Sequence, residues 1–265
     1  MVETGFALSA RGVHMEYRDR KSDTTLVAID TMDLDVGGGE FVSLLGPSGC
    51  GKSTFLKIVN GLLKGTAGEI RLRGDGKGRE DAMVFQDAAL FPWYSVLDNV
   101  AYGLVCAGVP RKQARARALP LIDLVGLAGF ADRYPYQLSG GMQQRANLAR
   151  ALAVDSEILL MDEPFASLDA QTREVMQAEL LRIWNAAKKT VIFVTHQIDE
   201  AIYLSDRVVV MSARPGRILA DIHIDLPRPR GLDLKRRPEF VGYADQIWHL
   251  LTTHGVAVEP TPDKG

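Results

Sequence analysis

The chain lacks the long apolar segments that place proteins in membranes. No uncharged stretch reaches the roughly 18 to 20 residues that a membrane-crossing helix needs, and the first residues carry neither a basic region nor an apolar run. It also lacks an excess of either charge, since 31 Lys and Arg residues face 33 Asp and Glu residues for a formal net charge of -2. We therefore expect synthesis and retention in the cytosol, and no nucleic-acid partner.

Cysteine is scarce as well. Cys50 and Cys106 are the only two in the chain, which excludes a disulfide framework and fits a reducing compartment. We expect both to be small buried side chains. The length of 265 residues suits one α/β domain, or a large domain that carries a smaller inserted one, and we expect the second.

The most informative stretch is a glycine-rich segment between an apolar run at 41–45 and an amphipathic run at 55–63. Glycines let successive backbone N–H groups point into one concave space, and the start of a helix adds a positive dipole end, so the segment suits phosphate oxygens. Lys52 would reach the terminal phosphates and the Ser53 hydroxyl would bind Mg²⁺. A glycine-rich turn before an ordinary helix is the alternative. The segment reads Gly46, Pro47, Ser48, Gly49, Cys50, Gly51, Lys52, Ser53, Thr54.

Short strands are expected before this segment, in residues 6–45, because Met32, Leu34 and Val36 alternate with acidic residues. The first helix should carry an apolar face from Phe55 to Leu63. A strand at 69–73, a polar turn at 74–80 and a strand at 83–85 follow.

Residues 95–153 have helical spacing and form our candidate inserted subdomain. Ser95 followed by Asp98 resembles a helix cap, and a last helix should begin near 138–141 and run to Ala153. Pro120 lies inside the predicted helix 111–124, where we expect a kink or break.

Strands and helices alternate again from residue 158. We expect strands at 158–161, 191–195 and 207–211, with helices at 172–187 and 198–204. Apolar strands separated by helices predict a mostly parallel sheet that is covered on both faces. The expected fold class is therefore α/β.

Polar residues follow three of these strands. Asp162 and Glu163 would lie where ligands bind in open α/β sheets, so that Asp162 holds Mg²⁺ and Glu163 orients or deprotonates a water. His196 would donate a hydrogen bond to a phosphate oxygen, and Gln86 would offer its amide oxygen to the metal or the water. Taken singly, the acids could cap the next element, and the histidine and glutamine could be structural.

In this order the motifs make the chain similar to the nucleotide-binding subunit of an ATP-binding cassette (ABC) transporter, over residues 6 to 250. Besides the phosphate loop, the resemblance rests on five motifs of that family, which occur here in the family's order. They are the glutamine-loop residue Gln86, the signature at 138–141, the end of the Walker B motif at 162–164, the D-loop at 167–169 and the switch histidine His196.

The resemblance implies a P-loop NTPase fold with a mostly parallel central sheet, an N-terminal antiparallel β subdomain and an inserted α-helical subdomain. The core would comprise residues 6–86 and 155–225, the helical subdomain 87–154, and the C-terminal connector, helix and tail 226–265.

The resemblance also implies the ligands and their residues. ATP and Mg²⁺ would be bound by the phosphate loop, with Tyr17 stacked on adenine, and Ser53, Gln86 and Asp162 would hold the metal. Ser139, Gly140 and Gly141 would contact ATP held by a second subunit, and Asp169 would belong to the D-loop. The family signature is often followed by glutamine at the position that Met142 occupies here. We expect the methionine to be compatible with function.

The resemblance implies three partners. They are a second copy or another ABC subunit in a dimer, integral membrane permease subunits and, indirectly, an extracytoplasmic solute-binding protein. The implied location is the cytoplasmic face of the membrane. Residues 90–100 and 226–230 are similar to the nitrate, sulfonate and taurine importer branch. Phe91, Trp93 and Tyr94 would contact the permease, or else pack internally.

The resemblance implies an ATP-hydrolysing subunit that energises an ABC importer for a nitrate-, sulfonate- or taurine-type small anion. Three other functions stay open: an ABC importer ATPase for another small solute, a soluble ABC ATPase that is not coupled to transport, and an adaptor that binds ATP without cleaving it. The basic run around Pro227, Pro229 and Pro238 is expected to be a solvated linker, or a contact with lipid headgroups or a partner protein.

Overall fold

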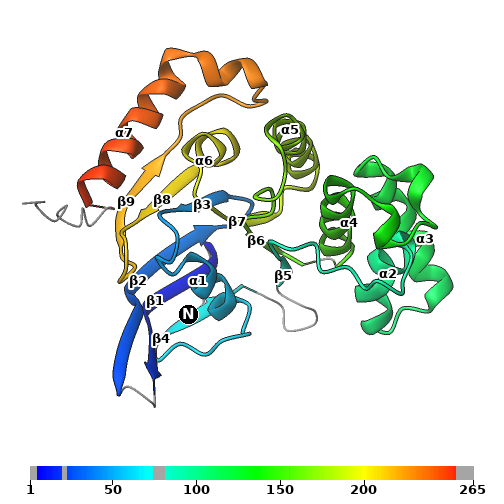
Figure 1. Ribbon diagram of the computed structural model, residues 1–265, viewed down its shortest axis with the longest axis horizontal. Coiled ribbons are helices and arrows are strands. Elements are labelled where there is room, and N and C mark those ends of the chain that lie inside the picture. The colour runs from blue at the N-terminus through cyan, green and yellow to red at the C-terminus, as the bar shows by residue number, and fades with distance from the viewer. Residues whose placement is uncertain (1–4, 20–22, 74–80, 155, 255–265) are drawn as a thin grey trace, which may run out of the picture.

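The computed structural model describes residues 5–19, 23–73, 81–154 and 156–254. The described strands form two sheets, and a group of helices lies beyond one edge of the larger sheet (Figure 1). This arrangement agrees with the expected fold class. The expected turn at 74–80, the boundary at 155 and the tail at 255–265 lie outside the described residues.

The smaller sheet is antiparallel and has the order β2-β1-β4. It contains β1 (Phe6–Asp19), β2 (Thr24–Gly37) and β4 (Ala67–Leu72). The alternation seen in the sequence is confirmed, because Met32, Leu34 and Val36 are buried while Asp33 is exposed. The prediction of short strands is wrong: β1 and β2 are each 14 residues long, since their pairing continues through bulges.

The larger sheet has the order β5-β6-β7-β3-β8-β9. Its strands are β3 (Phe41–Leu45), β5 (Asp81–Val84), β6 (Ile158–Asp162), β7 (Thr190–Thr195), β8 (Arg207–Met211) and β9 (Ile218–His223). All neighbours pair in parallel except β9, an antiparallel edge strand that the sequence did not reveal. The carboxyl ends of the parallel strands therefore meet at one edge.

Each central strand buries both of its faces, as the apolar runs predict. In β7, Val191 and Phe193 belong to one core cluster and Ile192 and Val194 to another. The first cluster lies under α5 (Ala170–Ala187), α6 (Ile198–Leu204) and α7 (Pro238–His254). The second lies against the antiparallel sheet and α1 (Lys52–Val59), on the opposite side of the larger sheet (Figure 1).

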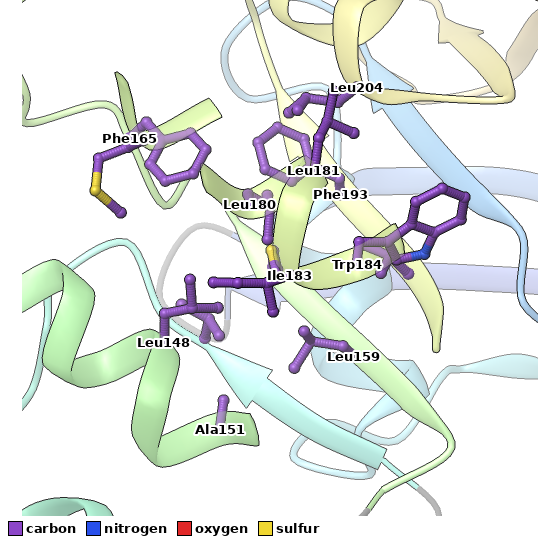
Figure 2. Close-up of a cluster of buried hydrophobic side chains, with 14 of the residues drawn as sticks. Leu148, Ala151, Leu159, Phe165, Leu180, Leu181, Ile183, Trp184, Phe193 and Leu204 are labelled. Atoms are coloured by element: carbon purple, nitrogen blue, oxygen red, sulfur yellow. The ribbon is translucent and has the colours of Figure 1, made fainter. Parts of the chain in front are cut away.

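The first cluster also joins the group of helices to the sheet. Figure 2 shows Leu148 and Ala151 of a helix in that group near Leu159 of β6 and Ile183 of α5. Burying such side chains contributes about 1.5–3 kcal/mol each. This contact fixes the helical group beside β6, the strand that ends in the two acids.

The helical group lies between β5 and β6 in the chain and contains α2 (Val96–Cys106), α3 (Arg111–Leu124) and α4 (Gly140–Ala153). Ser95 caps α2 by accepting a hydrogen bond from the Asp98 N–H, as predicted. We expected a kink or a break at Pro120, and the expectation of a break is wrong, because α3 continues through Pro120 to Leu124. Pro120 is exposed while Ala114, Ala118 and Ile122 are buried, so water can serve the carbonyl that proline leaves free.

Three smaller expectations are wrong. Helix α1 ends at Val59, and Leu62, expected on its buried face, is 55% exposed. Cys106 is exposed at the end of α2, whereas Cys50 is buried as predicted. Strand β5 ends at Val84, before Phe85. Among the described residues, no helix combines the length and the apolar character needed to cross a membrane.

The basic connector is also not the solvated run that we expected. Arg230 is 7% exposed, and its guanidinium donates to carbonyl oxygens at the end of α6 and at Ile224 and Leu226. Arg228 pairs with Asp206 and lies 4.2 Å from the centre of the Trp184 ring. Both arginines fasten the chain to the core. Of the remaining basic residues of the run, Lys235 is half-buried and pairs with Glu174, whereas Arg236 and Arg237 are exposed.

Candidate functional site

The glycine-rich segment forms the turn between β3 and α1. Gly51 precedes the helix with φ +99°, and a Cβ there would lie 2.8 Å from the Ala28 carbonyl oxygen of β2. Only glycine fits a position that is both left-handed and this crowded. The turn therefore directs the start of α1, with its unpaired N–H groups and positive dipole end, toward the carboxyl edge of the larger sheet.

Lys52 is enclosed by the same turn. Lys52 is 4% exposed, and its Nζ donates to the carbonyl oxygens of Gly46 at 2.7 Å and Pro47 at 2.9 Å. A buried ammonium needs such partners because desolvation of an unpaired charge is costly. The positive charge thus lies inside the loop that the sequence predicts to bind phosphates.

Ser53 and Asp162 are brought together from sites 109 residues apart. The Ser53 hydroxyl donates to Asp162 Oδ1 at 2.7 Å. Burial raises the pKa of the Asp162 carboxyl above its ordinary value, while the Ser53 hydrogen bond opposes that shift. A hydroxyl and a carboxylate are oxygen donors, which Mg²⁺ prefers. In the described part of the chain, no cluster of three or more His, Cys, Asp or Glu residues is suited to a metal.

Glu163 and His196 form the second contact at this edge. His196 Nδ1 lies 3.0 Å from Glu163 Oε2, within hydrogen-bonding distance. Strand register brings them together, because Asp162 of β6 pairs with Val194 of β7, and Glu163 and His196 follow these two residues closely. Glu163 adopts φ +44°, a conformation that costs a side-chain-bearing residue about 1–2 kcal/mol and often marks a functional position.

The remaining predicted residues come from β1 and from the segments after β5 and before α5. Gln86 is exposed two residues beyond the end of β5. Tyr17 lies in β1 opposite Leu26 of β2, with 41% of the residue exposed. Asp169 caps α5, where its Oδ1 accepts from the Thr172 N–H at 2.9 Å.

The signature residues are not part of the same pocket in one chain. Ser139 caps α4 through a hydrogen bond from the Met142 N–H at 3.4 Å, and Ser139 and Gly140 are exposed while Gly141 is half-buried. Figure 1 shows α4 with the helical group, away from α1. The start of α4 therefore presents its N–H groups to the outside of the molecule.

Two residues near the site were missed at the sequence level. Arg214, in the turn after β8, donates to the Gly49 carbonyl oxygen at 3.3 Å, and a Cβ on Gly216 would lie 2.0 Å from the Cys50 carbonyl oxygen. This turn supports the phosphate loop from the side of β8. A Pro-Gly pair in the sequence predicts a turn but not what the turn touches.

Comparisons with known proteins agree with this arrangement. A family model described as ABC transporter matches residues 29–166. An uncharacterized ABC transporter ATP-binding protein of Methanocaldococcus jannaschii is 53% identical over 227 residues, which are 84% of each chain. A taurine import ATP-binding protein of Rhizobium johnstonii is 46% identical, over 86% of this chain and 90% of its own. A nitrate import ATP-binding protein of a Synechocystis strain is 42% identical, over 86% and 89%.

A solved structure is similar as well. It is the dimeric post-hydrolysis state of an ATP-binding cassette bound to ADP and Pi, with 32% identity and a TM-score of 0.71 over 84% of this chain and 99% of that one. The likeness thus covers the fold and the sequence together. The chain belongs to the ABC transporter family, as an ATP-binding subunit and an ATPase of the ABC type.

Proposed function

We propose that this chain cleaves ATP at the carboxyl edge of its larger sheet and thereby drives an importer for a small anion. The observation that carries the proposal is the convergence of two contacts beside Lys52: Ser53 with Asp162 at 2.7 Å, and Glu163 with His196 at 3.0 Å. Strands β3, β6 and β7, which are adjacent in the sheet, deliver all of these residues.

The chemistry follows from the groups present. The loop N–H groups, the start of α1 and the Lys52 ammonium would bind the phosphates of ATP. Glu163 would orient or deprotonate the water that attacks the γ-phosphate, and Gln86 would help to position it. His196 would donate to a phosphate oxygen as charge develops, and its contact with Glu163 keeps both side chains at the place where the water must lie.

The oxygens of Ser53 and Asp162 fit Mg²⁺, and Gln86 can add an amide oxygen. When bound, Mg²⁺ would neutralise charge on the phosphate oxygens. Ser53 and Asp162 already share a hydrogen bond, so their oxygens are held close together before any ion arrives.

Glu163→Gln tests the catalytic assignment. The amide keeps the size of the side chain but cannot accept a proton, so ATP turnover should fall about 100-fold or more while ATP binding is retained. Glu157→Gln is the matched control, since Glu157 is an exposed residue just before the same strand, β6. Undiminished phosphate release by Glu163→Gln would refute the role given to Glu163.

We also propose that two cassettes act as a pair. The start of α4, with Ser139, Gly140 and Gly141, is exposed and carries the N–H groups that attract an anion. In a pair, it would close on the ATP held by the other phosphate loop, and Asp169 would lie at the same contact. Support comes from the similar cassette that was solved as a dimer bound to ADP and Pi.

The importer assignment rests on the relatives named for taurine and nitrate import. The substrate class would therefore be a small nitrate-, sulfonate- or taurine-type anion, selected by a permease and a solute-binding protein. The subunit would bind the cytoplasmic face of that permease.

A groove of about 610 Å³ suits the permease contact. One wall comes from the end of α1 and from β5, the other from α2 and α4, and Phe91, Tyr102 and Arg150 line it. Trp93 is 67% exposed and lies against Phe91, with 5.7 Å between ring centres. An apolar groove bordered by exposed aromatic rings fits an amphipathic helix of a partner.

The test isolates the tagged chain from detergent-solubilised membranes of cells that express it and identifies the bound proteins by mass spectrometry. We expect a polytopic membrane protein, and we expect Trp93→Ala to reduce its recovery while ATP binding is unchanged. Trp248→Ala is the matched control, because Trp248 is 51% exposed but lies on α7. Recovery of soluble proteins alone would favour an ABC ATPase that is not coupled to transport.

A further inference from the structure

Glu200 is a buried acid that the proposed reaction does not use. It lies in the first turn of α6 and is 3% exposed. Its Oε1 accepts from Gln177 Nε2 at 3.1 Å, and its Oε2 accepts from the Thr195 hydroxyl. A carboxyl group is rarely buried this deeply without a reason beyond packing, because taking it out of water is costly.

Thr195 connects this acid to the candidate site. Its hydroxyl hydrogen is donated to Glu200, and its oxygen accepts from the Gln197 N–H at 3.0 Å, so one hydroxyl links the acid to the backbone after His196. His196 is the residue between Thr195 and Gln197. Thr195 itself is 1% exposed and forms the last position of β7.

The turn is also held from α5. Arg173 donates to the Gln197 side chain at 3.1 Å and to the Leu168 carbonyl oxygen at 2.7 Å, which joins the turn after β7 to the segment after Glu163. Gln177 in turn accepts a hydrogen bond of 3.1 Å from the Nζ of Lys235, which belongs to the C-terminal connector.

We propose that Glu200, acting through the Thr195 hydroxyl, is a positioning residue that fixes the backbone turn of His196 so that its imidazole meets Glu163. The inference rests on the catalytic roles proposed for Glu163 and His196. Without the hydroxyl, the Gln197 N–H loses its acceptor and the turn can rotate. The His196 ring then loses its alignment, although the phosphate loop, on the neighbouring strand β3, keeps its own contacts.

The test compares two threonines of the same strand. Thr195→Val removes the hydroxyl next to His196. Thr190→Val is the matched control, because Thr190 lies at the other end of β7, is 3% exposed, and also accepts a backbone hydrogen bond, from Gly39 at 2.9 Å. The readouts are kcat and KM for ATP and the melting temperature of each variant.

We expect Thr195→Val to lower kcat about tenfold or more with KM changed less than about twofold, since a small misplacement of a reacting group is enough for such a loss. Thr195→Ser should restore the rate. Thr190→Val should keep the wild-type kcat even though its stability falls by a similar amount.

Glu200→Gln is a second variant that does not depend on the folding of the valine variant. Gln177 and Thr195 donate to different oxygens of the Glu200 carboxylate, and the amide replaces one of these oxygens with an NH₂ group that only donates. One of the two hydrogen bonds is therefore lost in this geometry, and kcat should fall with KM unchanged here too. Equal kcat values for Thr195→Val, Glu200→Gln and the wild type would overturn the inference. His196→Ala separates this inference from the proposed function. If His196→Ala loses activity while Thr195→Val and Glu200→Gln keep theirs, only the inference is wrong. If His196→Ala keeps the wild-type rate as well, the proposed role of His196 in ATP cleavage is also wrong.

Discussion

Lys52 lies inside the loop that would bind phosphates, and its ammonium already has two carbonyl oxygens as partners. Binding of ATP must exchange part of this contact for phosphate oxygens, which carry full negative charge. The exchange favours ATP because a negatively charged phosphate oxygen attracts the ammonium more strongly than a neutral carbonyl oxygen does.

Lys52→Ala should therefore weaken ATP binding itself. Loss of one hydrogen bond between charged groups corresponds to about 1.5–3 kcal/mol, or about 10- to 100-fold in Kd. Titration of a fluorescent ATP analogue measures this change. Lys64→Ala removes the same charge from an exposed position beyond α1 and should leave Kd unchanged. Equal affinities for the wild type and Lys52→Ala would show that the loop is not the phosphate site.

Motif spacing predicts which residues face the site but not how they are held. The acids after β6 and the histidine after β7 follow from apolar runs that end in polar residues, and parallel strands bring such ends together. The left-handed backbone of Glu163 and the support of Gly49 by Arg214 could not be predicted. Both depend on contacts between segments far apart in the chain.

At the scale of whole elements, the connector after β9 is fastened to α6 by Arg230. Its guanidinium donates to carbonyl oxygens at Ile202, Tyr203 and Ser205, which the end of the helix leaves without partners. Burial lowers the pKa of Arg230 to about 10, so the group stays charged at neutral pH. The arginine thus acts as a C-terminal cap for α6 supplied by a distant segment.

Arg230→Ala should lower the free energy of unfolding by about 3 kcal/mol, because several buried carbonyl groups lose their donor at once. Chemical denaturation followed by circular dichroism gives the value. Arg236→Ala, at an exposed position of the same connector, should change stability by less than about 0.5 kcal/mol. The capping role would be wrong if the two variants unfolded at the same denaturant concentration.

Helices and strands whose apolar residues repeat regularly could be predicted from the sequence. Segments whose structure depends on contacts with distant parts of the chain could not. Helix α6 and strand β8 match their predicted ranges. Strand β9 escaped notice because only Ile222 of its six residues is buried, which leaves no clear alternation. The basic connector was misjudged because composition does not show whether an arginine meets water or a row of carbonyl groups.

At the scale of the whole molecule, the two sheets and the helical group form a cassette with two separate surfaces, the phosphate loop and the start of α4. In our proposal, each surface of a chain contacts a different one of the two nucleotides in the pair. The phosphate loop lies at the edge of the sheet, and the start of α4 is exposed elsewhere (Figure 1). The fold class was predictable because apolar runs alternate with helices. The completed site was predictable only through the family resemblance, since the second half of it comes from another copy in our proposal.

Sedimentation velocity of Glu163→Gln with and without Mg²⁺ and ATP tests this central claim most directly. We predict that the sedimenting mass doubles with ATP and stays that of one chain without nucleotide. Adding Ser139→Arg, which puts a bulky side chain at the start of α4, should abolish the doubling although ATP still binds. Tight ATP binding at the mass of a single chain, or doubling that Ser139→Arg does not affect, would contradict the account.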